Sequence, residues 1–202
     1  RLLCAYRRGI FPWYSTDQPI LWWSPDPRTV LYPDALKISR SLKKTLRHRG
    51  YRVTSDQNFS SVIQACAKPR DSSDDIGTWI MPEMIKAYTT LSESGYAHSV
   101  EVWDQMKLVG GLYGVAIGGV FFGESMFSCS TDASKTALTA LVRIISEKNF
   151  QLIDCQVPSK HLFSLGAQNI PRARFSGQLQ AALAVESQPD IWNYCFDSLD
   201  LL

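Results

Sequence analysis

The most constraining feature of the sequence is a series of three apolar segments between residues 97 and 127. Ala97–Trp103 alternates between apolar and polar residues, and Leu108–Ile117 and Val120–Phe127 follow at hairpin spacing. This pattern predicts an antiparallel meander of three strands. The longest uncharged run, Leu108–Gly123, is shorter than the ~18–20 residues that cross a membrane, and it holds six glycines. We therefore assign it to strands and expect no membrane segment here.

Helical patterns lie on both sides of this meander. Asp56 is expected to cap a helix that buries Phe59, Val62, Ile63 and Cys66. Further helices are predicted over residues 38–49, 82–95, 132–148, 161–165 and 175–185, and further strands over 51–54 and 150–156. This order predicts an α/β (α+β) protein, with a mixed sheet and flanking helices as in an N-acetyltransferase (GNAT) fold.

The first 33 residues differ in composition from the rest of the chain. Arg1–Gly9 is typical of the end of a helix closed by glycine, which suggests that the natural protein begins further upstream. Residues 10–33 are dense in Pro and Trp, and the prolines exclude a helix. The tryptophans are either packing anchors or a surface on which a ligand stacks. We expect a small N-terminal domain over 1–33 and a catalytic domain over 34–202.

Several common site types are excluded because their sequence motifs are absent. The chain has no phosphate-binding glycine loop of either common type, and Gly123-Glu-Ser-Met-Phe127 fails as a nucleophile elbow at its last position. The five cysteines form no C-x-x-C pair, and none lies near a histidine at zinc-ligand spacing. We expect no metal site, and free thiols in a reducing cytoplasm.

The net charge is only +2, but the basic residues are concentrated: seven of the 21 Lys and Arg residues fall between Lys37 and Arg52. On the predicted helix, Ile38, Leu42 and Leu46 share one face. The opposite face carries Arg40, Lys43, Lys44 and Arg47. Such a face suits phosphate contacts, although a solvated surface helix has the same pattern.

Three further stretches carry polar or flexible residues inside apolar strands. The glycines of Leu108–Val115 indicate either a bend or a close backbone approach to a ligand. Glu124 lies among apolar residues, where a carboxylate is costly unless it is paired, binds a substrate cation or reaches solvent. Asp154 and Gln156 are two apart, so on a strand they share a face and form either a hydrogen-bonded relay or a polar strand end.

Ten motifs in order resemble the leucyl/phenylalanyl-tRNA–protein transferase family over about residues 9–175. They are Gly9-Ile-Phe-Pro-Trp-Tyr14, Leu21-Trp-Trp-Ser-Pro-Asp-Pro-Arg28, Ile38-Ser-Arg-Ser-Leu42, Gly77-Thr-Trp-Ile80, Ala97-His-Ser-Val-Glu-Val-Trp103, Leu108-Val-Gly-Gly-Leu-Tyr-Gly114, Gly123-Glu-Ser-Met-Phe-Ser128, Ala133-Ser-Lys135, Leu152-Ile-Asp-Cys-Gln156 and Ser164-Leu-Gly-Ala167. Each is weak alone, but their succession is highly specific.

The resemblance implies a GNAT-like domain that does not use acetyl-CoA. It also implies transfer of Leu or Phe, and less often Met, from aminoacyl-tRNA to an N-terminal Arg or Lys of a protein, which marks that protein for degradation. Because the ester to tRNA is already activated, neither ATP nor another cofactor is expected. The expected partners are charged tRNA and acceptor proteins, and the expected state is a cytoplasmic monomer.

Site residues follow from the resemblance position by position. The proposed catalytic residues are Asp154, Gln156 and Glu124, and Trp13 and Trp79 resemble the rings that hold the terminal adenosine. Leu112, Phe121, Met126, Leu138, Leu141 and Ile145 occupy the side-chain pocket positions. Arg40, Lys44, Arg47 and His48 occupy the tRNA-contacting positions, where the histidine departs from the family's basic residue.

Three other functions stay open. An acetyl-CoA-dependent N-acetyltransferase would need a glycine-containing pyrophosphate loop, and Cys129–Lys135 has no glycine in that place. A tRNA-binding homologue without activity is disfavoured by the retained Glu124, Asp154 and Gln156. A peptidoglycan-type aminoacyltransferase would share the fold and the tRNA donor but use another acceptor.

Overall fold

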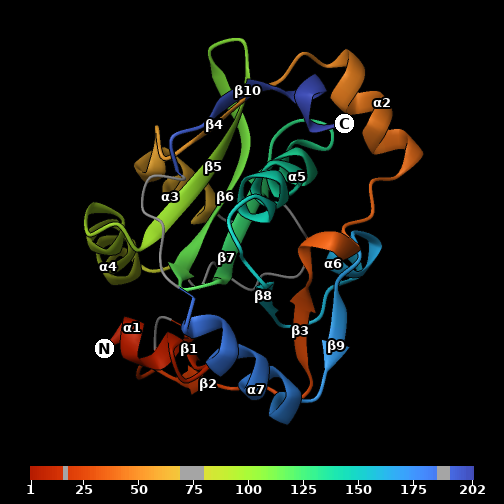
Figure 1. Cartoon of the computed structure of the whole chain (residues 1–202). Coiled ribbons are helices and arrows are strands. Elements are labelled where there is room, and N and C mark those ends of the chain that lie inside the picture. Colours follow the sequence, from red (N-terminus) through yellow and green to blue (C-terminus); the bar gives the residue numbers. More distant parts are fainter. Residues whose placement is uncertain (16–17, 69–79, 186–191) are drawn as a thin grey trace.

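The computed structural model describes residues 1–15, 18–68, 80–185 and 192–202 (Figure 1). Its main sheet has eight strands: β3 (Arg28–Leu31), β4 (Arg52–Ser55), β5 (Ala97–Asp104), β6 (Lys107–Ile117), β7 (Val120–Ser128), β8 (Leu152–Gln156), β9 (Gln168–Ile170) and β10 (Cys195–Asp197). They lie in the order β10–β4–β5–β6–β7–β8–β3–β9. Neighbouring strands are antiparallel except β7 and β8, which are parallel.

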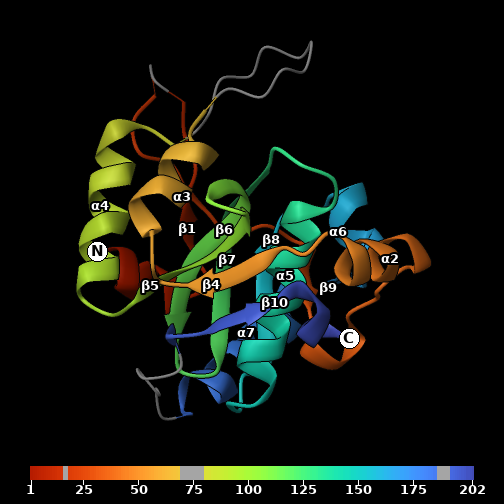
Figure 2. The same cartoon turned by 90° about the horizontal axis from the view of Figure 1, so that it is seen from above.

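Helices cover both faces of this sheet. They are α1 (Leu2–Tyr6), α2 (Arg40–His48), α3 (Phe59–Cys66), α4 (Pro82–Glu93), α5 (Ala133–Ser146), α6 (Lys160–Ser164) and α7 (Arg172–Leu183), with short 3-10 turns η1 (Pro33–Ala35) and η3 (Ser198–Leu201). Helices α2 and α5 pack into one apolar core, and α1, α3, α4 and α7 pack into the other (Figure 2). The predicted mixed sheet with flanking helices is therefore confirmed. Within the described ranges, no helix is both long and apolar enough to cross a membrane.

The glycines of β6 serve close packing within the protein. A Cβ on Gly110 would lie 2.5 Å from the Cβ of Ala133, so this glycine lets the start of α5 approach the sheet. A Cβ on Gly114 would meet the carbonyl oxygen of Phe122 at 2.2 Å, next to a register shift between β6 and β7. A bend and close packing within the protein therefore account for both glycines, without a close backbone approach to a ligand.

Several local expectations are corrected. Helix α3 is capped by Asn58, whose side chain accepts from the Ser61 N–H, and not by Asp56. Asp56 instead has a φ of 53° and accepts from the Ser99 N–H at 2.7 Å. Helix α2 begins at Arg40 after its Ser39 cap, two residues later than predicted. Helix α7 begins three residues early, at Arg172. The short edge strands β9 and β10 were not predicted, because three residues give no periodic signal.

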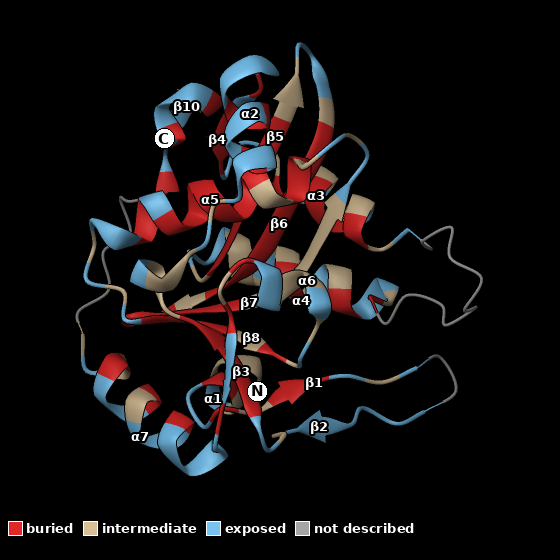
Figure 3. Cartoon of the chain, turned by 90° about the vertical axis from the view of Figure 1, so that its right-hand side faces the viewer, coloured by how far each residue is buried: buried red, intermediate tan, exposed pale blue. Residues whose placement is uncertain are grey.

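The N-terminal residues form α1 and a small hairpin of β1 (Phe11–Pro12) and β2 (Trp22–Trp23). These elements lie beside α7 at one end of the molecule (Figure 1), where a Cβ on Gly9 would lie 2.8 Å from the Phe175 ring. Strand β2 is exposed (Figure 3), so its tryptophans are not core anchors. Strand β3, although within the first 33 residues, pairs with β8 and β9 in the main sheet. The domain boundary after residue 33 stays a prediction.

Candidate active site

The candidate site lies where the two parallel strands separate. The β7–β8 ladder joins only Val120–Phe122 to Leu152–Asp154, after which β7 continues to Ser128 paired with β6 alone. A cavity of about 1220 Å³ is lined by both strands beyond this point, together with residues of α3, α5 and α6. Because the sheet is open here, side chains from both of its faces reach one space.

The wall on the α5 side of the cavity is apolar. Five of the six predicted pocket residues line it: Leu112, Phe121, Met126, Leu138 and Leu141. Ile153 of β8 and Leu162 of α6 complete it and were not predicted. Ile145 is fully buried in the core further along α5 and is not among the lining residues. Five of the six residues thus line one cavity, and their role in binding an aminoacyl side chain stays a prediction.

The other side of the cavity is polar and centres on Glu124. This residue is the extra one at the β6–β7 register shift, where Tyr113 pairs with Ser125 and Gly114 pairs with Gly123. The Tyr88 hydroxyl donates to Glu124 Oε2 at 2.7 Å, and Gln156 Nε2 donates to Oε1 at 2.8 Å. A tyrosine has one hydroxyl hydrogen, and Tyr88 uses its own towards Glu124. The Tyr6 hydroxyl therefore donates to the Tyr88 oxygen, at 2.5 Å.

Glu124 titrates in the neutral range. Burial raises its pKa to about 7, even though the hydrogen bonds from Tyr88, Tyr6 and Gln156 oppose the shift. No Lys, Arg or His in the described part of the chain forms a salt bridge with it. The carboxyl group is therefore held in place but not neutralised, which suits proton transfer near neutral pH.

Asp154 and Gln156 do not share an environment. Asp154 is fully buried, and both its oxygens accept from Arg28, at 2.7 Å from Nε and 2.6 Å from Nη2. Gln156 has a φ of 64°, so β8 departs from extended geometry there, and its backbone N–H donates to Asp154 Oδ1 at 3.0 Å. Only Gln156 lines the cavity. Asp154 therefore influences the cavity only indirectly, by holding the backbone of Gln156.

Arg28 contacts Asp154 and was not among the predicted site residues. It is fully buried, and its guanidinium lies 4.8 Å from the centre of the Phe11 ring and 4.5 Å from that of Phe175. The sequence offered one signal, a basic residue at the start of the otherwise uncharged segment Arg28–Leu31. Such a residue requires a buried acidic partner, and Asp154 is that partner.

Of the two predicted adenosine-stacking rings, one can be placed. Trp13 lines the mouth of the cavity and is 41% exposed. The Trp23 indole N–H donates to the Trp13 carbonyl oxygen at 2.7 Å, and the two rings lie 6.4 Å apart. Trp79 lies outside the described residues. Lys68 and Lys107 also line the cavity, so cations stand at its polar rim.

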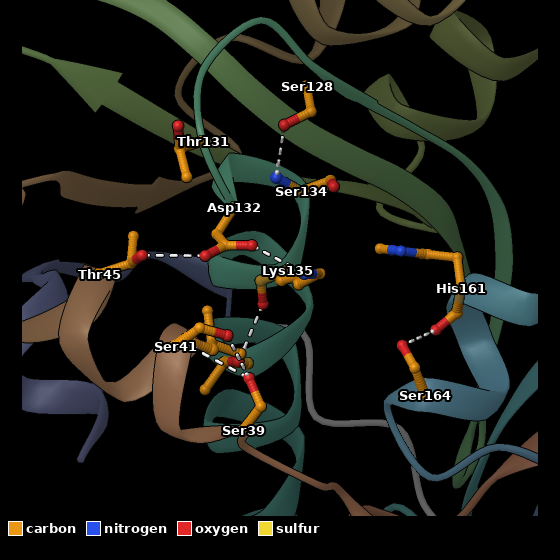
Figure 4. Close-up of polar contacts among 12 residues, drawn as sticks. Ser39, Ser41, Thr45, Ser128, Thr131, Asp132, Ser134, Lys135, His161 and Ser164 are labelled. Atoms are coloured by element: carbon orange, nitrogen blue, oxygen red, sulfur yellow. Dashed lines mark hydrogen bonds and ion pairs between the residues drawn. The ribbon is translucent and has the colours of Figure 1, made fainter.

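Helix α2 presents the predicted basic face. Arg40, Lys44, Arg47 and His48 are all exposed, while Leu42 and Leu46 are fully buried. Thr45 donates to Asp132 Oδ2 at 2.9 Å, and Lys135 donates to Oδ1 of the same carboxylate at 2.7 Å (Figure 4). Asp132 immediately precedes α5, whose Ser134 lines the cavity. The hydrogen bond from Thr45 to Asp132 thus holds the basic helix α2 next to the start of α5, close to the cavity.

Comparison with known proteins defines the group to which this chain belongs. Residues 30–180 match the family described as leucyl/phenylalanyl-tRNA protein transferase, and residues 1–26 match the N-terminal domain of the same proteins. A leucyl/phenylalanyl-tRNA–protein transferase of Stutzerimonas stutzeri is 59% identical over 94% of this chain and 83% of its own length. The protein of the same name from Nitrosomonas europaea is 55% identical over 97% and 82%.

The fold, the site and these relatives define an enzyme of the aminoacyltransferase class. The chain belongs to the leucyl/phenylalanyl-tRNA–protein transferase family. A GCN5-related N-acetyltransferase from Kribbella flavida aligns with 80% of this chain and 56% of its own at 12% identity, with a TM-score of 0.37. That likeness is too weak to add to the fold described above.

Proposed function

We propose that this chain transfers Leu or Phe, and less readily Met, from aminoacyl-tRNA to the N-terminal Arg or Lys of a protein, marking that protein for degradation. The observation that carries the proposal is the cavity at the β7–β8 split, which joins an apolar wall to the carboxyl group of Glu124. Its volume of about 1220 Å³ exceeds the ~300–1,000 Å³ usual for one small ligand. Two substrate ends can therefore meet in it.

Three features bind the donor: the basic face of α2, the Trp13 ring of the N-terminal hairpin and the apolar wall beside α5. The basic face of α2 holds the acceptor stem through phosphates, which carry no sequence information, so several tRNAs are accepted. Trp13, with Trp79, stacks the terminal adenine. The apolar wall takes the aminoacyl side chain and rejects charged ones, because burying an unpaired charge is costly. Discrimination between Leu and Val is modest, since one methylene is worth ~1–3 kcal/mol.

The chemistry is the attack of the acceptor's α-amine on the ester carbonyl. The C–N bond forms, the bond between the carbonyl carbon and the ribose oxygen breaks, and the amine proton passes to Glu124 and then to the departing ribose oxygen. The pKa of Glu124, about 7, lies close to the ~7.7–8.0 of an α-amine, so the proton transfer is nearly balanced. Gln156 holds Glu124, and Asp154 holds Gln156 through its backbone. Much of the rate gain comes from positioning.

The site of action follows from the substrates. Aminoacyl-tRNA is a substrate found in the cytoplasm, so we expect the enzyme there. We also expect a monomer.

The decisive test mixes the purified protein with radiolabelled Leu-tRNA and a peptide beginning with Arg, without ATP or CoA. We expect label in this peptide and none in a peptide that begins with Gly. Salt-dependent tRNA binding without transfer would instead support a binding protein. Transfer to a muropeptide, and not to the Arg peptide, would support a peptidoglycan-type enzyme.

A further inference from the structure

Three tyrosines lie near the Glu124 carboxyl group, and one of them stands outside the hydrogen-bonded chain that ends on it. Tyr6 and Tyr88 form the hydrogen-bonded chain that ends on Glu124. Tyr113 also lines the cavity and lies within the electrostatic reach of Glu124. Its hydroxyl group is buried and has no hydrogen-bond partner in the part of the chain that the structure describes.

The Tyr113 ring is held too firmly to turn towards water. It is fully buried in β6 and makes edge contacts with Phe59, at 5.8 Å, and with Tyr88, at 5.5 Å between ring centres. An unsatisfied buried hydroxyl costs ~1–3 kcal/mol, and a phenylalanine would avoid this cost. A hydroxyl kept at such a position, on the wall of a substrate cavity, points to a ligand that supplies the missing partner.

The position of Tyr113 identifies which substrate it faces. Neighbours on a strand point to opposite faces of the sheet, so Tyr113 lies on the α3 side while Leu112 contributes to the apolar wall. The residues of α3 that line the cavity are Ser61, Gln64, Ala65 and Cys66. The ligand that Tyr113 meets lies next to the Glu124 carboxyl group, and beside a carboxylate an amine is favoured over a phosphate or an aliphatic side chain.

The acceptors available here match the donors of an N-terminal ammonium. Such a group carries three N–H bonds. Glu124 offers a carboxylate oxygen, and Gln156, whose Nε2 is already used by Glu124, offers its amide oxygen. The Tyr113 phenol is the third acceptor, and it stays protonated because burial raises its pKa well above the usual value.

We propose that Tyr113 binds the acceptor: its hydroxyl oxygen accepts a hydrogen bond from the N-terminal ammonium, beside Glu124 and Gln156. It so positions the nitrogen, which loses one proton to solvent and then attacks as the free amine. This inference rests on the proposed function and adds the residue that seats the nucleophile. Because the α-amine is common to all acceptors, Tyr113 contributes equally whether the first side chain is that of Arg or Lys. The apolar wall and the basic helix play no part in this contact.

The test is Tyr113→Phe in the full chain, compared with wild type for transfer of Leu from Leu-tRNA to peptides beginning with Arg or Lys. We expect the KM for both peptides to rise by the same factor, roughly 10- to 100-fold, because one hydrogen bond to a charged group is lost. The KM for Leu-tRNA stays unchanged. Thermal stability stays the same or rises, because the hydroxyl has no partner in the free protein.

Tyr51→Phe is the matched control. Tyr51 is also fully buried, but its hydroxyl donates to Ser130 at 2.8 Å, away from the cavity. This variant should lose thermal stability and keep its peptide KM. An unchanged peptide KM in Tyr113→Phe, unequal effects on the two peptides, or a loss of stability like that of Tyr51→Phe would each overturn the inference. Absence of transfer by the wild type would instead overturn the proposed function.

Discussion

Glu124 and Asp154 lie on the neighbouring parallel strands β7 and β8, and the same glutamine touches both of them. Gln156 donates its backbone N–H to Asp154 and its side-chain amide to Glu124. Asp154 has a bidentate arginine partner and no surface on the cavity, whereas Glu124 lines the cavity and has only neutral donors. An ion pair fixes one carboxylate as part of the framework. The other remains available for chemistry.

This difference separates two kinds of contribution that sequence motifs do not distinguish. Removing a partner from a buried ion pair leaves an uncompensated charge and should affect folding. Removing a carboxyl group that lacks a cationic partner should affect the reaction and leave folding intact.

Glu124→Gln should have the largest effect, and it should fall on the reaction. We expect the rate of aminoacyl transfer to fall by roughly 100- to 10,000-fold, the usual contribution of a general base. The wild-type rate should rise as the pH passes through about 7. Single-turnover transfer at several pH values measures both, with the exposed Glu147→Gln as control. A variant with wild-type rate would exclude Glu124 as the base.

Arg28→Met should have the next largest effect, on stability. It leaves Asp154 buried without its cation, and we expect a loss of ~3–5 kcal/mol in the free energy of unfolding. Two apolar side chains leave no unpaired charge next to the Phe11 and Phe175 rings, so the double variant Arg28→Met/Asp154→Leu should recover most of this loss. Urea unfolding measures both. Equal instability of the single and double variants would show that the unpaired charge is not the cause.

Asp132→Asn should have the smallest effect, because Asn also accepts a hydrogen bond and tolerates the φ of 56° found there. We expect a stability loss of about 1 kcal/mol or less at pH 7 and an unchanged transfer rate. Burial opposes ionisation of Asp132, but the hydrogen bonds from Lys135 and Thr45 outweigh it and lower its pKa below 3.8. Its contribution to stability is therefore present above about pH 3.8 and lost as the pH falls through the lowered pKa.

Glu124 has the opposite sign, which unfolding at a series of pH values can detect. Its pKa is raised from 4.5 to about 7 in the folded chain. The folded state then binds more protons, so stability should fall between about pH 4.5 and pH 7 as Glu124 ionises. Glu124→Gln should abolish this fall, and Asp132→Asn should retain it. The same fall in both variants would assign it to another group.

The elements that the sequence predicted well are those with long periodic signals. The meander and α5 follow from apolar spacing over many residues, and the pocket side chains of β6, β7 and α5 came with them. Strands β9 and β10 depend on pairing with distant segments, so three residues did not reveal them. Ile145 continues the apolar stripe of α5, and a stripe alone does not indicate where a cavity ends.

The polar part of the site was predicted only in part. Asp154, Gln156 and Glu124 were identified, but alternation alone placed Asp154 and Gln156 on one face, and the left-handed φ of Gln156 breaks that alternation. Arg28, Tyr6, Tyr88 and Tyr113 come from four other elements and meet only in the fold. Their convergence has no counterpart in local spacing, so the structure was needed to find them.

The separation of β7 and β8 has a consequence for the kinetics and evolution of the enzyme. Because residues on both faces of the sheet line the cavity, we expect the tRNA end and the peptide to approach it from different sides. Neither substrate then blocks the other, and binding in random order with independent product release is expected. Substitutions on one side of the cavity can also accumulate while the other side stays unchanged. The preference for the amino acid and the preference for the acceptor can therefore evolve independently.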